Sequence, residues 1–184
     1  VSTLGSSMVI NSDFPALSLI ANWGTELYAD VVTTSSRKDA AAPDFEFQAK
    51  SRGNFAENST YWSIGSFLYL EQSPLAVGEH EFVVRGGARV DSFSAHAPDV
   101  TPELGDVDYS YAGLVGSLSI SHLYSTVSNV FVSWNQGFRA PNLQETTVLG
   151  DTGNFFEVPN PDLGPERSNT FELGNKLDFK QILR

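Results

Sequence analysis

Apolar and polar residues alternate along the segment from His80 to Ser94. One face of this segment carries Phe82, Val84, Gly86, Ala88 and Val90, and the other carries Glu81, Arg85, Arg89 and Asp91. Side chains of a β-strand point alternately to opposite faces of the sheet, so a period of two indicates a strand with one apolar and one polar face.

The same period recurs twice further along the chain. In 111–121, Ala112, Leu114, Leu118 and Ile120 alternate with Ser117, Ser119 and Ser121. In 169–179, Phe171, Leu173, Leu177 and Phe179 alternate with Thr170, Glu172, Lys176 and Asp178. Other strands are predicted at 60–72, 127–137 and 26–36, with weaker signals at 16–22 and 3–10. The pattern predicts an all-β fold of about eight strands of roughly ten residues and contains no convincing helix.

The connections predicted between these strands alternate in length. Residues 23–25, 73–79 and 122–126 form short connections, whereas 37–59, 95–108 and 138–168 form long ones. Transmembrane β-barrels have short turns on one side of the membrane and long loops on the other, so we expect an antiparallel up-and-down meander that is part of a larger transmembrane barrel. The short connection at 11–15 departs from this rule. A soluble all-β module stays open as an alternative.

Composition narrows the classes of function. The 184 residues fit one domain, cysteine is absent and the net charge is -11 with 11 basic residues. The acidic balance argues against nucleic-acid binding, because that needs a basic footprint. The chain contains no run of about 18 apolar residues, so no membrane-spanning helix is predicted. Residues 1–5 do not have the pattern of a signal peptide.

Chemistry-bearing residues form no strong enzyme or metal pattern. The histidines, His80, His96 and His122, lie far apart in sequence, so we predict no metal site and no resident cofactor. Acidic residues in 99–108 and 151–162 lack the spacing of an EF-hand, and we interpret them as solvated loops, with calcium binding as the alternative. No nucleophile elbow, zinc helix or phosphate loop occurs, so we do not expect an enzyme. A barrel hydrolase is a distant alternative.

Two boxes bracket the longest predicted loop. The first is Phe138-Arg139-Ala140-Pro141, and the second is Asn160-Pro161-Asp162-Leu163, followed by Pro165-Glu166 and a strand that opens at Ser168. Proline fixes its own φ angle and restricts the residue before it, so the boxes predict a loop braced at both ends. In combination they resemble the barrel of TonB-dependent outer-membrane receptors, from about Ser51 to Leu177.

The resemblance implies a transport function. It implies a bacterial outer-membrane receptor that takes up a scarce nutrient, with membrane lipid, a small-molecule ligand and the TonB complex as partners. A ferric siderophore or another iron chelate is the expected ligand, with haem and cobalamin as the alternative ligand classes. Haem receptors of this family carry an iron-ligating histidine between the two boxes, and residues 142–159 contain no histidine.

The resemblance also suggests candidate ligand contacts and a domain assignment. Within the loop the candidates are Arg139, Asn142, Asn160 and Asp162, although the boxes could equally serve only to shape the loop base. On the strand at 80–94, Arg85, Arg89 and Asp91 would line the barrel lumen, where they could pair with one another. Receptors of this family have a plug domain and 22 strands, so we expect residues 1–184 to be an internal section of the barrel, without the plug and the C-terminal strands.

Overall fold

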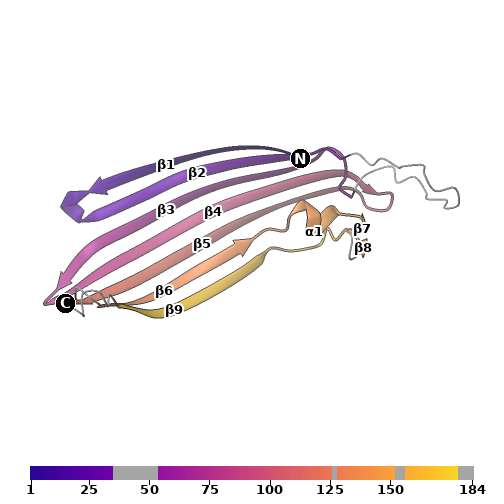
Figure 1. The fold of residues 1–184 in the computed structure, drawn as a ribbon. Helices are drawn as coiled ribbons and strands as arrows, with labels where there is room; N and C mark the ends of the chain where they lie inside the picture. The colour runs from indigo at the N-terminus through magenta and orange to yellow at the C-terminus, as the bar shows by residue number, and fades with distance from the viewer. Residues whose placement is uncertain (35–53, 126–127, 152–155, 178–184) are drawn as a thin grey trace.

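Seven long antiparallel strands form one sheet (Figure 1). The computed structural model describes residues 1–34, 54–125, 128–151 and 156–177. The strands of this sheet are β1 (Ser2–Phe14), β2 (Leu19–Val32), β3 (Ser59–Val77), β4 (His80–Thr101), β5 (Gly105–Ser125), β6 (Ser128–Arg139) and β9 (Glu166–Leu177). Each strand pairs with the next in the order β1-β2-β3-β4-β5-β6-β9. The predicted all-β, up-and-down meander is therefore confirmed.

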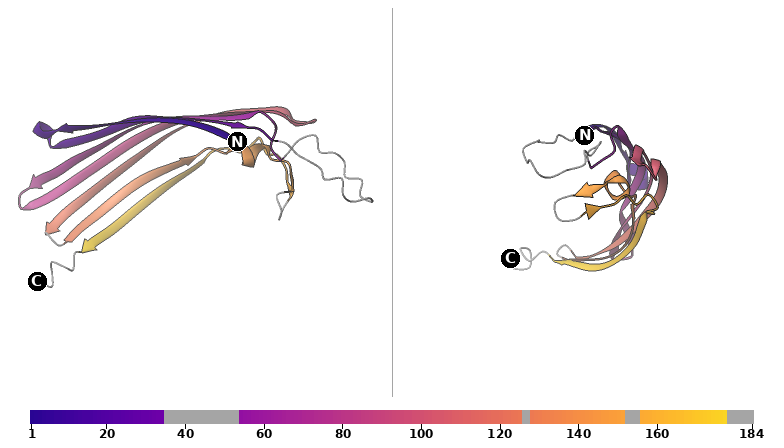
Figure 2. Two further views of the ribbon diagram at one scale, coloured as in Figure 1. Left: turned by 45° about the horizontal axis from the view of Figure 1, so that its top comes forward. Right: turned by 90° about the vertical axis from the view of Figure 1, so that its right-hand side faces the viewer.

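The sheet is curved (Figure 2). Its two faces differ in the chemistry of their side chains. The register places large apolar side chains from all seven strands on the convex face, among them Ile10, Trp23, Leu68, Val90, Leu118, Val132 and Leu173. These side chains are exposed, with Leu114 at 64%, Phe171 at 76% and Leu173 at 81%. So large a contiguous apolar surface is the mark of a face that meets lipid or another protein.

The concave face carries the polar half of the alternation and a set of aromatic rings. Arg85, Arg89 and Asp91 share this face of β4 with Ala95 and Ala97, which lie beneath the β6–β9 loop. In three register pairs a ring lies over a glycine on the adjacent strand: Tyr28 over Gly5, Phe67 over Gly24 and Phe131 over Gly174. A Cβ at Gly24 would clash with the backbone oxygen of Met8 and lie 3.0 Å from Cζ of Phe67, so glycine makes room both for β1 and for the ring.

Two predicted strand boundaries are wrong. Residues 16–22 and 26–36 were expected to be two strands joined by a turn at 23–25, but Trp23, Gly24 and Thr25 lie inside β2. Gly24 weakens the local strand signal, yet its backbone is fully paired and its missing side chain admits Phe67. The first turn falls at Pro15–Leu17 (η1), after β1, at the same end of the sheet as the turn between β3 and β4, where a short connection is expected.

The expected long loop at 95–108 is also wrong. β4 and β5 continue to Thr101 and from Gly105, so only residues 102–104 form the turn. Asp106 accepts a hydrogen bond from the backbone N–H of Asp99 at 3.0 Å and braces the irregular end of this hairpin. The strands β3, β4 and β5 span 19, 22 and 21 residues, about twice the expected length.

A few expectations fall outside the described residues. These are most of the connection at 37–59, residues 35 and 36 of the strand expected at 26–36, residue 127 of the strand expected at 127–137, and residues 178 and 179 of the last strand. For the described part of that last strand the alternation is as predicted, with Phe171 and Leu173 on one face and Thr170 and Glu172 on the other.

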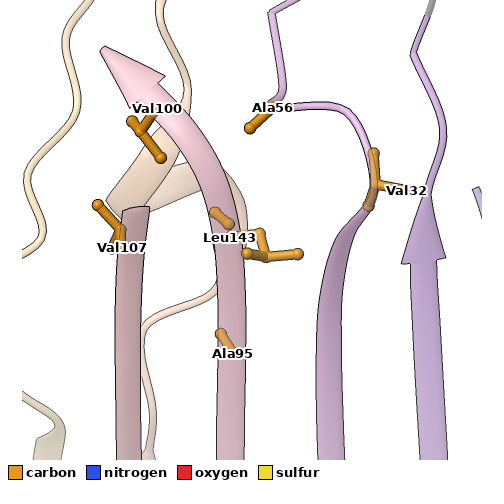
Figure 3. Packing of buried hydrophobic residues seen from close by; sticks show 7 residues of the cluster. Val32, Ala56, Ala95, Val100, Val107 and Leu143 are labelled. Carbon is orange, nitrogen blue, oxygen red and sulfur yellow. The ribbon is translucent and has the colours of Figure 1, made fainter. Parts of the chain in front are cut away.

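The small apolar core lies at one end of the concave face (Figure 3). Its buried members are Val32, Ala56, Ala95, Ala97, Val100, Val107 and Leu143, with Phe55, Tyr61 and Tyr109 packed against them. They come from strand ends and from two connections, so this core fastens the loops to the sheet. The middle of the sheet is held by the backbone ladder and by contacts within each face.

Adjacent residues of β5 allow a matched test of the two faces. Leu118→Lys places a charge on the convex apolar face, and Ser117→Lys places the same charge on the concave face. For protein folded into lipid vesicles, we expect Leu118→Lys to lower the free energy of unfolding by about 2–4 kcal/mol and Ser117→Lys to change it much less. Urea titration followed by tryptophan fluorescence measures both. Equal effects would contradict a lipid-facing convex surface.

Candidate functional site

The connection between β6 and β9, residues 140–165, is the candidate site. It contains a five-residue helix, α1 (Leu143–Thr147), and a small hairpin formed by β7 (Gly150–Asp151) and β8 (Phe156–Glu157). These elements lie inside the curve of the sheet at the end that holds the apolar core (Figure 2). The loop therefore covers part of the concave face instead of extending away from it.

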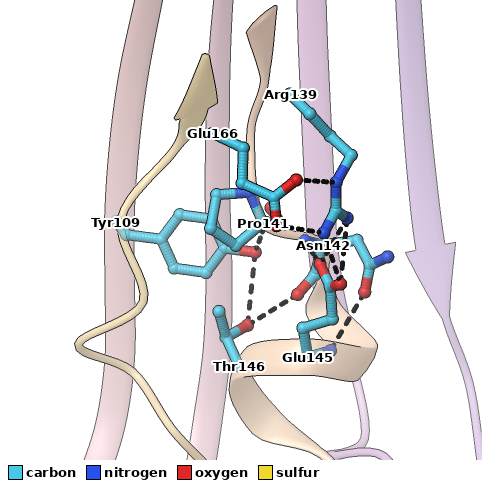
Figure 4. Close-up of polar contacts among 7 residues, drawn as sticks. All are labelled: Tyr109, Arg139, Pro141, Asn142, Glu145, Thr146 and Glu166. Atoms are coloured by element: carbon cyan, nitrogen blue, oxygen red, sulfur yellow. Dashed lines mark hydrogen bonds and ion pairs between the residues drawn. The ribbon is translucent and has the colours of Figure 1, made fainter. Parts of the chain in front are cut away.

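A three-residue ion-pair cluster closes the base of this loop (Figure 4). Arg139 ends β6, Glu166 begins β9, and the two residues are register partners. The guanidinium of Arg139 donates to the Glu166 carboxylate through Nε at 3.2 Å and Nη2 at 3.0 Å. Its Nη1 and Nη2 also donate to Glu145 of α1 at 2.9 Å. Arginine suits this arrangement because its planar fork presents several donors in fixed directions.

The cluster shifts the protonation equilibria of its members. The hydrogen bonds from Arg139, together with its charge, hold the pKa of the Glu166 carboxyl below its ordinary value of 4.5. Hydrogen bonds to Glu166 and then to Glu145 raise the pKa of Arg139. Arg139 and Glu166 are therefore both charged at neutral pH, and their pairing weakens when the Glu166 carboxylate takes up a proton.

Asn142 begins α1 through a reciprocal cap. Its Oδ1 accepts the backbone N–H of Glu145 at 3.0 Å, and its own backbone N–H donates to Glu145 Oε2 at 3.1 Å. This is a capping box, which satisfies backbone donors that the first turn of a helix leaves without partners. Glu145 thus links the helix cap to Arg139, and Asn142 has a structural role that its side chain already fulfils.

Two tyrosines of β5 hold the loop over the concave face. The hydroxyl of Tyr109 donates to the carbonyl of Pro141 at 3.3 Å, and that of Tyr111 donates to the carbonyl of Leu163 at 2.5 Å. These carbonyls belong to the first and second boxes, respectively. Thr146 of α1 also donates to the Tyr109 hydroxyl at 3.3 Å. Both boxes are therefore bound to one strand of the sheet.

The rest of the first box packs inward. Phe138 lies over Gly113 and stacks with Phe93 at a ring-centroid distance of 5.9 Å, while the guanidinium of Arg167 lies 5.0 Å from its centroid. Ala140 and Pro141 are buried. This box is thus the hinge at which the chain leaves the sheet and turns over the concave face.

The second box presents its polar side chains to solvent. Asn160 and Asp162 are exposed, whereas Pro161 and Leu163 are half-buried. The backbone N–H of Asn160 donates to the carbonyl of Thr146 at 3.1 Å, so the position of this residue is set by α1. The four loop candidates therefore separate: Arg139 and Asn142 are engaged within the loop, and Asn160 and Asp162 face outward.

The candidates on β4 form ion pairs on the concave face. Arg85 donates to Glu71 at 2.9 Å and to the Ser121 hydroxyl at 3.3 Å. Arg89 donates to Asp91 and, across β3, to Glu26 of β2, at 2.9 Å in each case. Their side chains are partly exposed, so these charges are paired but remain in contact with solvent.

The structure brings together two histidines that lie far apart in sequence. Antiparallel pairing of β4 and β5 brings His80 and His122 together, with Nδ1 of the first 3.1 Å from Nε2 of the second. Forty-two positions of chain separate them, and only the register makes them neighbours. His96 pairs with Asp108 at 2.8 Å. Among the described residues no group of three or more histidine, cysteine or carboxylate side chains is placed to hold a metal ion.

Comparison with known protein families shows the family to which the chain belongs. The family described as "TonB dependent receptor-like, beta-barrel" matches residues 7–183. The chain belongs to this family of outer-membrane transport receptors, and its place is the bacterial outer membrane. Searches of curated proteins and of solved structures gave no match. In the described part of the chain, no helix is long and apolar enough to cross a membrane.

Sequence reasoning missed α1 and the tyrosine anchors. The spacing Asn142-x-x-Glu145 was a usable signal for the helix, because it is that of a capping box. Nothing local marked Tyr109 or Tyr111, because their partners lie 32 and 52 positions away. The crevice lined by Arg139, Glu145 and Glu166 holds only about 70 Å³, so these three side chains do not enclose a nutrient-sized ligand.

The absence of cysteine makes the loop easy to probe. A spin label at Asn160→Cys is the only thiol-linked label in the chain. We expect Arg139→Ala to increase the mobility of this label at pH 7, because the loop base loses both carboxylate contacts. Arg139→Lys should give an intermediate spectrum, since an ammonium keeps the charge but lacks the planar fork. Spectra identical to those of the parent would contradict the clamp.

The same label tests the pH dependence of the clamp. Because the folded-state pKa of Glu166 is lowered, its contribution to stability is complete above the ordinary carboxyl pKa of 4.5 and is lost as the pH falls through the lowered value. We expect the label to become mobile as the pH falls below 4.5. In the Glu166→Gln variant the spectrum at pH 7 should already show raised mobility. A parent spectrum that stays constant as the pH falls well below 4.5 would contradict the assignment.

Proposed function

We propose that this chain forms part of a receptor that imports a ferric siderophore or a related iron chelate, with energy supplied through the TonB complex. The observation that carries the proposal is the braced loop of a family whose members are transport receptors. A loop held at both ends, and tied to the wall below, presents its outward side chains in a defined arrangement. Such preorganisation lowers the entropic cost of capturing a dilute ligand.

The contacts within the loop support different roles for its candidate residues, some positioning the loop and others contacting the ligand. Arg139 and Asn142 position the loop through their bonds to Glu145 and Glu166, whereas the exposed Asn160 and Asp162 contact the ligand. Amide and carboxylate groups can bind the polar periphery of a chelate. The segment 142–159 has no histidine, which favours a chelate whose iron is already fully coordinated over haem.

The exposed convex face supports a membrane barrel over a soluble module. A soluble protein rarely leaves a continuous apolar surface of this extent in water. The sheet of the described residues is open, with β1 and β9 at its edges, and unpaired backbone is not tolerated in lipid. In the proposed receptor both edges pair with further strands, and the concave face surrounds a plug domain through which TonB acts.

Uptake of radiolabelled iron tests the proposal. Cells that produce the receptor should accumulate iron from a ferric siderophore only when TonB is present. We expect the double variant Asn160→Ala/Asp162→Ala to weaken chelate binding roughly tenfold or more, through the loss of hydrogen bonds to the ligand. Asp13→Ala, an exposed change at the opposite end of the sheet, is the matched control.

The outcomes separate the candidate ligands. Uptake of haem or cobalamin, but not of any ferric siderophore in the panel, would replace the iron-chelate assignment while keeping a TonB-driven receptor. Uptake that does not require TonB would contradict the proposal that the TonB complex supplies the energy for import. Unchanged binding by the double variant, with normal insertion in the membrane, would show that Asn160 and Asp162 do not contact the ligand.

A further inference from the structure

A histidine pair lies on the convex face, at the end of the sheet where a short turn joins β3 to β4. His80 begins β4, and His122 lies on β5 opposite Phe82, on the same face as Ile120. Nδ1 of His80 and Nε2 of His122 are 3.1 Å apart, and the ring centroids are 5.0 Å apart at an interplanar angle of 64°. His80 is exposed and His122 is half-buried. His80 lies directly after the turn between β3 and β4, so the pair is at the rim of the sheet and not in the middle of its lipid-facing surface.

Neighbouring rings hold His122 in this orientation. Phe82 stacks on it with a centroid distance of 4.8 Å and an interplanar angle of 18°, and Tyr124 meets it edge-on at 6.0 Å. The His122 ring is thereby sandwiched between side chains of β4 and β5, with its Nε2 directed toward His80. One ligand atom is therefore preorganised, and the more exposed His80 ring can adjust to it.

We propose that His80 and His122 form a two-histidine site for a single divalent transition-metal ion. Imidazole nitrogens bind Zn²⁺ at about 2.0–2.1 Å, and two such ligands at tetrahedral or right angles lie roughly 2.9–3.4 Å apart. The observed separation of 3.1 Å falls within that interval. With His122 held in place, the His80 ring must turn aside, so that its Nδ1 lone pair meets the Nε2 lone pair of His122 at the ion.

The protonation balance is simple. In the metal-free pair, the N–H of one ring donates a hydrogen bond to the unprotonated nitrogen of the other ring. On binding, that proton moves to the opposite nitrogen of the donor ring, so both rings stay neutral and present a lone pair to the ion. His80 then binds through Nδ1 and His122 through Nε2. No oxidant, reductant or further group is needed.

The surroundings fix the class of ion and the openness of the site. Imidazole ligands suit copper, zinc and nickel, and affinity among these is highest for Cu²⁺. No third protein ligand converges on the pair within the described residues, so water completes the coordination and the ion exchanges readily. Glu79 and Glu81 flank His80 in sequence and are exposed, and their charge raises the local concentration of cations.

Copper binding to the protein purified in detergent tests this site. The probe is Cu²⁺ at one equivalent, followed by electron paramagnetic resonance and by titration. We expect a spectrum with nitrogen couplings from two imidazoles. His80→Gln and His122→Phe, which keeps the ring stacked on Phe82, should each leave one nitrogen and weaken binding on the order of a hundredfold, because the second ligand no longer acts intramolecularly.

His96 gives the matched control. It is the remaining histidine, and its partner Asp108 makes it the alternative copper ligand. His96→Asn should leave both the two-nitrogen spectrum and the affinity unchanged. A parent spectrum with couplings from one imidazole or none would overturn the proposal irrespective of how the variants fold. The same holds if His96→Asn, but neither change at the pair, abolishes tight binding.

Discussion

The whole structure depends on the requirement that backbone polar groups be paired where apolar side chains face lipid. The meander meets this requirement inside the sheet, because each strand between β1 and β9 exchanges hydrogen bonds with two neighbours. Side-chain alternation then assigns one face to lipid and the other to the lumen. The apolar convex face, the paired charges on the concave face and the need for partners at β1 and β9 all follow from it.

The candidate site builds on the same alternation. Register pairing of Arg139 with Glu166 places opposite charges where the two strands separate, and Glu145 of α1 completes the cluster. The concave positions of Tyr109 and Tyr111 let β5 hold the loop from below. The loop is consequently an extension of the sheet, and substitutions at its base should act on the position of the loop.

Local patterns predicted the strands well and their ends poorly. The alternation around Val90, Leu118 and Leu173 predicted the two faces directly, because the polarity of each side chain matches the face to which it points. Gly24 was misread as a turn, since its role is to make room for Phe67 on the adjacent strand. The extension of β4 and β5 to 101 and from 105 depends on pairing between them, which no single segment encodes. The His80–His122 pair and the tyrosine anchors were hidden for the same reason: their partners are distant in sequence.

The orientation of the sheet toward lipid is the central claim, and the accessibility of spin labels along β5 tests it most directly. Single-cysteine variants at consecutive positions from 112 to 120 would carry one label each, in protein inserted in bilayers. Collision with apolar oxygen and with a water-soluble nickel chelate would be measured at every position. We predict a period of two, with oxygen favoured at 112, 114, 116, 118 and 120 and the nickel chelate favoured at the positions between them. Equal access of the nickel chelate to both sets would contradict the account.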